Sequence, residues 1–205
     1  MRRFALALLA VLSMPLPMIA GAQARPPVLS DTDAKALDAV SAYLNSITTL
    51  KGGFIQIEPS GAVDEGLFYI SKPGKLRFEY KPPSATLLVS DGRVVAVANT
   101  RLNTVDRYFL SDTPLGLILN KSIDLRHDPQ LDSVTHQGGS IVIGLHTVNR
   151  NTKASITLVF SEPEYELRQW SVLDNQGTTT TVALRALVPG VALPASLFVL
   201  PEKKH

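Results

Sequence analysis

The segment that decides the fold is Leu76-Arg77-Phe78-Glu79-Tyr80-Lys81, which lies between Pro73-Gly74 and Pro82-Pro83. Every second side chain in it is apolar, and the side chains between them are charged. Because successive side chains of a β-strand point to opposite faces of a sheet, this alternation predicts a strand with one apolar and one wet face. The flanking proline and glycine residues predict turns at both ends.

Similar runs recur along most of the chain. They predict further strands at residues 54–57, 67–70, 86–89, 94–98, 141–145, 156–160, 165–172 and 182–187. Hairpin turns are predicted between runs at Asp91-Gly92, Gly138-Gly139 and Asn175-Gln176-Gly177. About ten short strands in meander order predict a mostly β protein with an antiparallel sheet or open barrel.

Two segments have a helical pattern instead. Between Asp31 and Leu50, apolar residues recur at spacings of three and four, with Ser30 or Asp31 available as the N-cap and Gly52-Gly53 as the end. The apolar stripe consists of Leu37, Val40, Leu44 and Ile47. A second, short apolar helix is predicted between Asp112 and Asn120, where an acidic or hydroxyl cap and Pro114 open the segment.

The N-terminus has the order of a secretory signal peptide. Arg2 and Arg3 precede an apolar run over residues 4–12, and Ala22-Gln23-Ala24 forms an A-x-A cleavage site. The run is too short for a transmembrane helix, which needs about 20 apolar residues. We therefore expect residues 1–24 to be removed and residues 25–205 to form one exported domain.

Composition excludes several kinds of site. The chain contains no cysteine, which removes disulfides, thiol catalysis, cysteine-bound zinc and a lipid anchor on a terminal thiol. It has 20 Lys and Arg against 18 Asp and Glu, and loss of Arg2 and Arg3 makes the numbers equal. A neutral domain gives no electrostatic reason to expect a nucleic-acid partner.

No residue pattern predicts catalysis. The histidines at positions 127, 136, 146 and 205 lack the spacing of a helical zinc motif, and His127-Asp128 would point to opposite faces of a strand. Gly138-Gly139-Ser140 lacks the second glycine of a nucleophile elbow, so a hairpin turn is the simpler interpretation. We expect neither enzyme activity nor a metal or cofactor. Helices that cover the sheet tightly would make a plain core, whereas loose covering would leave a ligand cavity.

Several motifs occur in the order and spacing seen in LolA-type periplasmic lipoprotein carriers. They are Gly53-Phe54-Ile55-Gln56, residues 66–80, Pro83, Val89-Ser90-Asp91-Gly92, Thr113-Pro114-Leu115 and Leu197-Phe198-Val199-Leu200-Pro201. The chain resembles this family over most of residues 25–205, most closely between residues 53 and 120. The resemblance implies an open, half β-barrel whose concave face is closed by a helical lid, with lipoprotein acyl chains held between them.

Alternation then assigns side chains to this acyl-binding cavity. The expected lipid-binding residues are Leu37, Val40, Leu44 and Ile47 on the lid helix, Phe54, Phe68, Ile70, Leu76, Phe78 and Tyr80 on the sheet, and Leu117 and Ile118 in the short helix. In the family an arginine commonly precedes the proline after the second strand and bonds to the lid. Here that residue is Lys72, which we expect to act as the latch with a point charge instead of a planar fork.

The resemblance also implies partners. An inner-membrane ABC transporter would release lipoproteins to this carrier, and an outer-membrane lipoprotein receptor would accept them. We expect a periplasmic monomer without a cofactor. The alternative is a periplasmic domain of the same architecture that senses lipid or lipoprotein and regulates a membrane-bound partner.

We predict cleavage after Ala24 and recovery of the protein in the soluble periplasmic fraction. Intact-mass spectrometry should show an unmodified chain that begins at Arg25, and Ala24→Leu should retain the leader because the cleavage site requires small residues. A chain that keeps Met1, or an acylated N-terminus, would contradict the export assignment.

Overall fold

The computed structural model describes residues 27–146, 154–174 and 176–202. Within these ranges eleven antiparallel strands form one sheet in the order β6-β5-β4-β3-β2-β1-β11-β10-β9-β8-β7. The strands are β1 (Thr49–Ile57), β2 (Val63–Ser71), β3 (Lys75–Tyr80), β4 (Thr86–Asp91), β5 (Val94–Asn99), β6 (Thr104–Phe109), β7 (Leu131–Gln137), β8 (Ser140–His146), β9 (Ser155–Ser161), β10 (Leu167–Leu173) and β11 (Thr179–Pro189). The predicted signal peptide, residues 1–24, lies outside the described residues.

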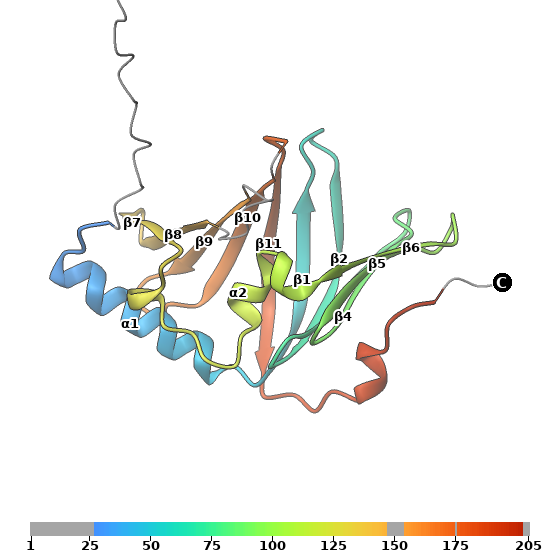
Figure 1. Cartoon of the computed structure of the whole chain (residues 1–205), viewed down its shortest axis with the longest axis horizontal. Helices are drawn as coiled ribbons and strands as arrows, with labels where there is room; N and C mark the ends of the chain where they lie inside the picture. Colours follow the sequence, from blue (N-terminus) through green and yellow to red (C-terminus); the bar gives the residue numbers. More distant parts are fainter. Residues whose placement is uncertain (1–26, 147–153, 175, 203–205) are drawn as a thin grey trace, which may run out of the picture.

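The sheet consists of two meanders joined along their first and last strands. β1 pairs with β11 from Leu50 opposite Pro189 to Ile57 opposite Thr181, which makes residues far apart in the sequence neighbours. β6 and β7 form the two edges, and the sheet does not close between them. The prediction of a mostly β fold with an open antiparallel sheet is confirmed (Figure 1).

Two helices lie against one face of this sheet. α1 (Asp31–Ser46) begins with a capping box, in which Ser30 Oγ accepts from the Asp33 amide at 3.1 Å and the Asp33 carboxylate accepts from the Ser30 amide at 3.0 Å. α1 runs below the β7–β10 half of the sheet, and α2 (Leu115–Leu119) lies in front of its middle strands (Figure 1). Across the described ranges, neither helix has the length and apolarity needed to span a bilayer.

The first helix is shorter than predicted. α1 ends at Ser46, because Ile47 already has extended backbone angles, and β1 begins at Thr49. Gly52-Gly53 therefore lie inside a strand, at a shift in its register with β11. A Cβ on Gly52 would come within 2.7 Å of the Phe68 ring and 2.9 Å of the Arg185 carbonyl oxygen. These glycines let Phe68 of β2 and Arg185 of β11 lie close to β1, and they do not end the helix.

Three further details differ from the sequence prediction. β6 and β7 were not predicted, because both are edge strands with few buried side chains. α2 has Pro114 at its N-cap, and no side chain caps it. His127 lies in a 3₁₀ turn, η2 (Leu125–His127), not in a strand, and its ring pairs with Asp124.

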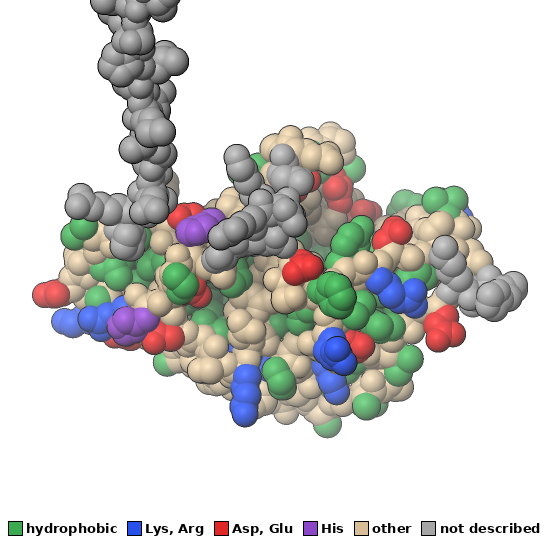
Figure 2. Space-filling view, in the orientation of Figure 1, with side chains coloured by type: hydrophobic (Ala, Val, Ile, Leu, Met, Phe, Trp, Pro, Cys, Tyr) green, Lys and Arg blue, Asp and Glu red, His purple; other side chains and the backbone are tan. Residues whose placement is uncertain are grey.

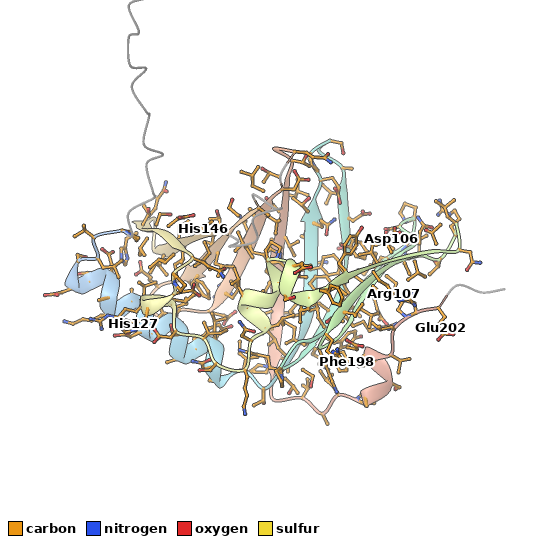
Figure 3. All side chains as sticks on the ribbon, viewed as in Figure 1. Asp106, Arg107, His127, His146, Phe198 and Glu202 are labelled. Carbon is orange, nitrogen blue, oxygen red and sulfur yellow. The ribbon has the colours of Figure 1, made fainter. Side chains whose placement is uncertain are left out.

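The C-terminal segment crosses the opposite face of the sheet. Phe198, in the 3₁₀ turn η3 (Ala195–Phe198), is buried against that face, on the side of β3 and β4. Arg77 Nη1 donates to the Leu197 carbonyl at 3.2 Å, and Arg107 Nη2 donates to the Pro201 carbonyl at 2.8 Å. Figure 3 shows Arg107, Phe198 and Glu202 together at this end of the molecule, away from α1.

Hydrogen bonds tie α1 to the segment around η2. Buried Ser41 Oγ accepts from the Leu125 amide at 3.0 Å and donates to the Leu37 carbonyl at 2.7 Å. The Asn45 side chain donates to the Ile123 carbonyl at 2.8 Å and accepts from the Ile123 amide at 2.9 Å. The helix and this segment are therefore connected through backbone groups.

We predict that Ser41→Ala lowers the free energy of unfolding by about 1–3 kcal/mol, because the buried Leu125 amide loses its acceptor. Urea unfolding should show a lower midpoint with an unchanged slope. Ser46→Ala is the matched control, since Ser46 is exposed and its hydroxyl donates to the Tyr43 carbonyl within its own helix. Equal midpoints for the two variants would contradict a stabilising role for the Ser41 bridge.

Candidate functional site

The apolar stripe of α1 is fully covered by the sheet. Leu37, Val40 and Leu44 are buried, and Ile47 is buried just beyond the end of the helix. Spacings of three and four place these side chains on one side of the helix, which explains why a single face is covered. All four belong to one apolar cluster with residues from both meanders.

The sheet contributes its alternate side chains to the same cluster. Phe68 lies directly opposite Phe78, and Ile70 lies directly opposite Leu76, in the pairing of β2 with β3. All four are buried, whereas Arg77 points to the other face and bonds to the C-terminal segment. Non-polar pairs on one face of neighbouring strands stabilise the sheet and leave that face apolar.

Five aromatic side chains surround the middle of this face. The ring of Phe54 lies 4.6 Å from that of Phe78 and 4.9 Å from that of Tyr80, between ring centroids. Phe78 also lies 5.6 Å from Phe68 and 6.0 Å from Trp170. Trp170, from β10, was not singled out in the sequence, although it lies within a run that was predicted as a strand.

Gly66 makes room for this aromatic group. A Cβ at that position would lie 2.0 Å from the Glu79 carbonyl oxygen and 2.6 Å from the Phe54 ring. The missing side chain therefore lets the Phe54 ring lie across β2. In the sequence, Gly66 is marked only by its place in a family motif.

A cavity of about 210 Å³ lies beside the aromatic group. Its apolar wall comes from both meanders and from Leu115 of α2, and its remaining lining is polar. The lining residues are Gln56, Phe78, Tyr80, Leu88, Leu115, Trp170, Val172, Asp174, Thr178, Thr180 and Val182. Figure 2 shows this side of the molecule hollowed near its middle, with hydrophobic and acidic side chains in and beside the hollow.

The short helix divides the remaining predicted residues. Ile118 is buried and lies near Lys72, Leu44 and Leu184 in a space of only about 20 Å³. Leu117 is half-buried and lines a different depression of about 510 Å³, together with Phe109 and Arg93. The predicted lipid-binding residues are thus brought into one cluster, although Leu117 of α2 is only partly buried there and also lines the second depression.

Lys72 joins the sheet to the end of α1. Its Nζ donates to the Leu44 carbonyl at 3.0 Å, which is one of the helix-end carbonyls without a partner inside the helix. Its backbone amide also donates to the Thr48 carbonyl at 2.8 Å. Burial lowers the pKa of the Lys72 ammonium from its ordinary value. The contact expected of a latch is present, and the latch function itself stays a prediction.

The same turn also holds the second helix. The Gly74 amide donates to the Leu119 carbonyl at the end of α2 at 2.9 Å. The Gly74 carbonyl in turn accepts from Ser90 Oγ at 2.8 Å, which fixes the turn against β4. One turn between β2 and β3 therefore bonds to the C-terminal ends of both helices.

At the polar end of the cavity, a partly buried tyrosine lies near two carboxylates. Tyr80 OH donates to Gln56 Oε1 at 2.6 Å, and the Gln56 amide donates to Glu58. Burial, and then the nearby carboxylates of Glu58 and Asp64, raise the pKa of the Tyr80 phenol. The phenol therefore stays neutral at physiological pH and can donate.

The histidines lie elsewhere. His146 contacts Asp132 at 2.7 Å and His127 contacts Asp124 at 2.9 Å, and Figure 3 shows both at the side of the molecule where α1 lies. His136 bridges Asp33 of α1 and Glu162. Within the described residues, no group of three or more His, Asp or Glu could hold a metal ion. His205 lies outside these residues.

Comparisons with known proteins agree on one family. The family model "Outer membrane lipoprotein carrier protein LolA" matches residues 45–201. A carrier protein of this name from Chromobacterium violaceum is 24% identical over 196 residues, which cover 92% of this chain and 94% of that protein. Another from Dechloromonas aromatica is 28% identical over 175 residues, covering 80% and 83% respectively.

Solved structures of similar shape are more distant. An uncharacterized conserved protein from Thermus thermophilus has a TM-score of 0.47 and 15% identity, covering 83% of this chain and 95% of its own. The Pseudomonas aeruginosa MucA/MucB complex has a TM-score of 0.46 and 12% identity, covering 82% and 62%. The family match rests on the sequence, where it extends over most of the chain. This chain therefore belongs to the LolA family of outer membrane lipoprotein carrier proteins.

Proposed function

We propose that this protein is a periplasmic carrier that binds the acyl chains of lipoproteins and shuttles them from the inner to the outer membrane. The observation that carries the proposal is the cavity between the apolar sheet face and α2, in a chain of the lipoprotein carrier family. The carrier acts by binding and needs no catalytic group. Residues 1–24 would direct export and would then be removed by cleavage after Ala24.

The physical need for such a carrier is large. Each CH₂ group exposed to water costs about 0.8 kcal/mol, so an anchor with several long acyl chains costs on the order of tens of kcal/mol. A carrier must recover most of this free energy, but one that recovered all of it could not release its cargo. A cavity that opens and closes meets both requirements.

The size of the cavity suggests that α1 and α2 move on loading. At about 210 Å³ it is smaller than the roughly 300–1,000 Å³ of typical small-molecule sites. Residues such as Leu44, Phe68 and Ile118 are now packed as core, and they would line a larger cavity once the helices separate from the sheet. The observed arrangement then corresponds to the closed form.

Lys72 is positioned to control this opening. Its bond to Leu44 and the Gly74 bond to Leu119 are polar contacts that hold the helix ends at one turn. A hydrogen bond of a charged group contributes about 1.5–3 kcal/mol, and less when it is partly exposed. Such a bond is strong enough to bias closure and weak enough to be broken by incoming acyl chains.

Two membrane partners complete the proposed route. An inner-membrane ABC transporter that releases lipoproteins would load the cavity, and an outer-membrane lipoprotein receptor would empty it. The carrier works as a monomer between them. A sensing domain would instead bind lipid as a signal and keep it, so the identity and the transfer of the bound material distinguish the two functions.

We predict that protein purified from the periplasm contains acylated peptides, and that Val172→Trp weakens binding of a fluorescent acyl probe roughly tenfold by overfilling the cavity. Val172 lines the cavity, and Leu173 is exposed on the other face of the same strand. Leu173→Trp is therefore the matched control and should bind as wild type does. Mass spectrometry that finds only free phospholipid would favour the sensing function, and equal probe affinity of both variants would reject this cavity.

We further predict that Lys72→Leu increases uptake of the acyl probe about fivefold, because loss of the bond to Leu44 favours the open form. Transfer of cargo to the outer-membrane receptor should decrease. Lys51→Leu makes the same change at an exposed position of β1 and should leave both steps unchanged. Unchanged uptake and transfer in the Lys72 variant would show that this lysine is not a latch.

A further inference from the structure

The cavity changes from apolar to polar toward one end, at the same level on several strands. The face of β1 that carries Phe54 continues with Gln56, whose side chain donates to Glu58 just beyond the end of the strand. In the paired strand β2, Asp64 lies directly opposite Gln56 on that face. The register places Asp64, and the bond from Gln56 places Glu58, beside the polar end of the cavity.

The second meander shows the same change. Trp170 and Val172 of β10 are followed by Asp174, which lines the cavity, and Val182 of β11 is preceded by Thr180. None of the described residues that line the cavity is a lysine or arginine. The polar end therefore offers hydroxyl and amide groups in a surrounding of negative charge.

We infer that this end of the cavity selects acyl ligands whose head is uncharged and bears ester or amide groups, and disfavours ligands with an anionic head. The inference rests on the proposed function, and it specifies which class of lipid the carrier accepts. The acylated glyceryl group of a lipoprotein anchor has such a head. Free fatty acids and anionic phospholipids do not.

Hydrogen bonding supports an uncharged head. The Gln56 side chain has two N–H donors, and its bond to Glu58 uses one of them. Thr178 and Thr180 add hydroxyl groups that can donate to an ester carbonyl oxygen. These groups match the acceptors of an acylated glycerol without requiring a cation.

Charge acts against an anionic head. A carboxylate or phosphate at this level would lie close to Asp174, and Glu58 and Asp64 carry the same sign. Like charges near a protein surface repel one another more strongly than in bulk water, because the effective dielectric constant is lower. An anionic ligand would also lose hydration without gaining a positive partner.

The test compares two ligands with the same acyl chain, monolaurin and laurate, by displacement of a fluorescent acyl probe at pH 8 and low salt. Asp174→Asn removes a charge but keeps Oδ1, which accepts from the Gln176 amide at 2.8 Å and the Thr178 amide at 2.9 Å. We expect the variant to bind laurate about fivefold more tightly than wild type does, so that the ratio of laurate affinity to monolaurin affinity rises by a similar factor. Glu58→Gln should act in the same direction.

Glu202→Gln is the control, because it makes the same change of charge in the C-terminal segment on the other face (Figure 3). It should leave both affinities as in wild type. Laurate affinity that neither the Asp174 nor the Glu58 variant changes, or an equal gain for both ligands, would overturn the charge selection while the carrier function stands. Failure of wild type to bind either ligand or a triacylated lipopeptide would overturn both proposals.

Discussion

The structure depends on keeping water from one large apolar face. Eleven strands form a single sheet, and the β1–β11 pair makes the two meanders present alternate side chains to the same side. Within the described residues, this face has two helices to cover it, and α2 consists of only five residues. The segment around η2 adds Ile123 and Leu125 to this cover. The cavity beside Trp170 lies next to Leu115, at the start of α2.

The cover is fastened in a way that leaves the sheet independent of it. The bonds from Lys72 to Leu44 and from Gly74 to Leu119 end on carbonyls of the helices, and none of them belongs to the ladders between strands. Each such bond contributes about 1–3 kcal/mol net, less than the apolar burial along α1. Acyl chains that take the place of the helix side chains can restore that apolar burial. The free-energy cost of separating the helices from the sheet then comes mainly from the few polar bonds. In the proposed carrier mechanism, the helices would then separate from the sheet without unfolding it.

Sequence alone predicts the parts of this arrangement that follow from local periodicity. The alternation at residues 76–81 and the spacing of Leu37, Val40 and Leu44 both recur as buried faces. Edge strands β6 and β7 have mostly exposed side chains and therefore lack an apolar alternation. The cavity itself was not predictable in detail, because Phe78 of β3 and the directly paired Trp170 and Val182 of β10 and β11 share one face only through the β1–β11 pair. The place of Lys72 before Pro73 predicts that its side chain lies where the helices meet the sheet. Its partner, the Leu44 carbonyl, could not be predicted, because it depends on where α1 ends.

The direction of the polar gradient determines how a bound lipid would lie. Apolar tails gain most beside Phe78 and Trp170, and a polar head loses least beside Gln56 and Thr180. The head of the ligand then lies toward the β1–β2 and β10–β11 hairpin tips, which Figure 1 shows projecting on the side away from α1. A polypeptide attached to that head would leave the molecule between these tips. Binding strength would come from burial of the tails and selectivity from the polar end of the cavity, and neither would require the attached protein to contact α1 or α2.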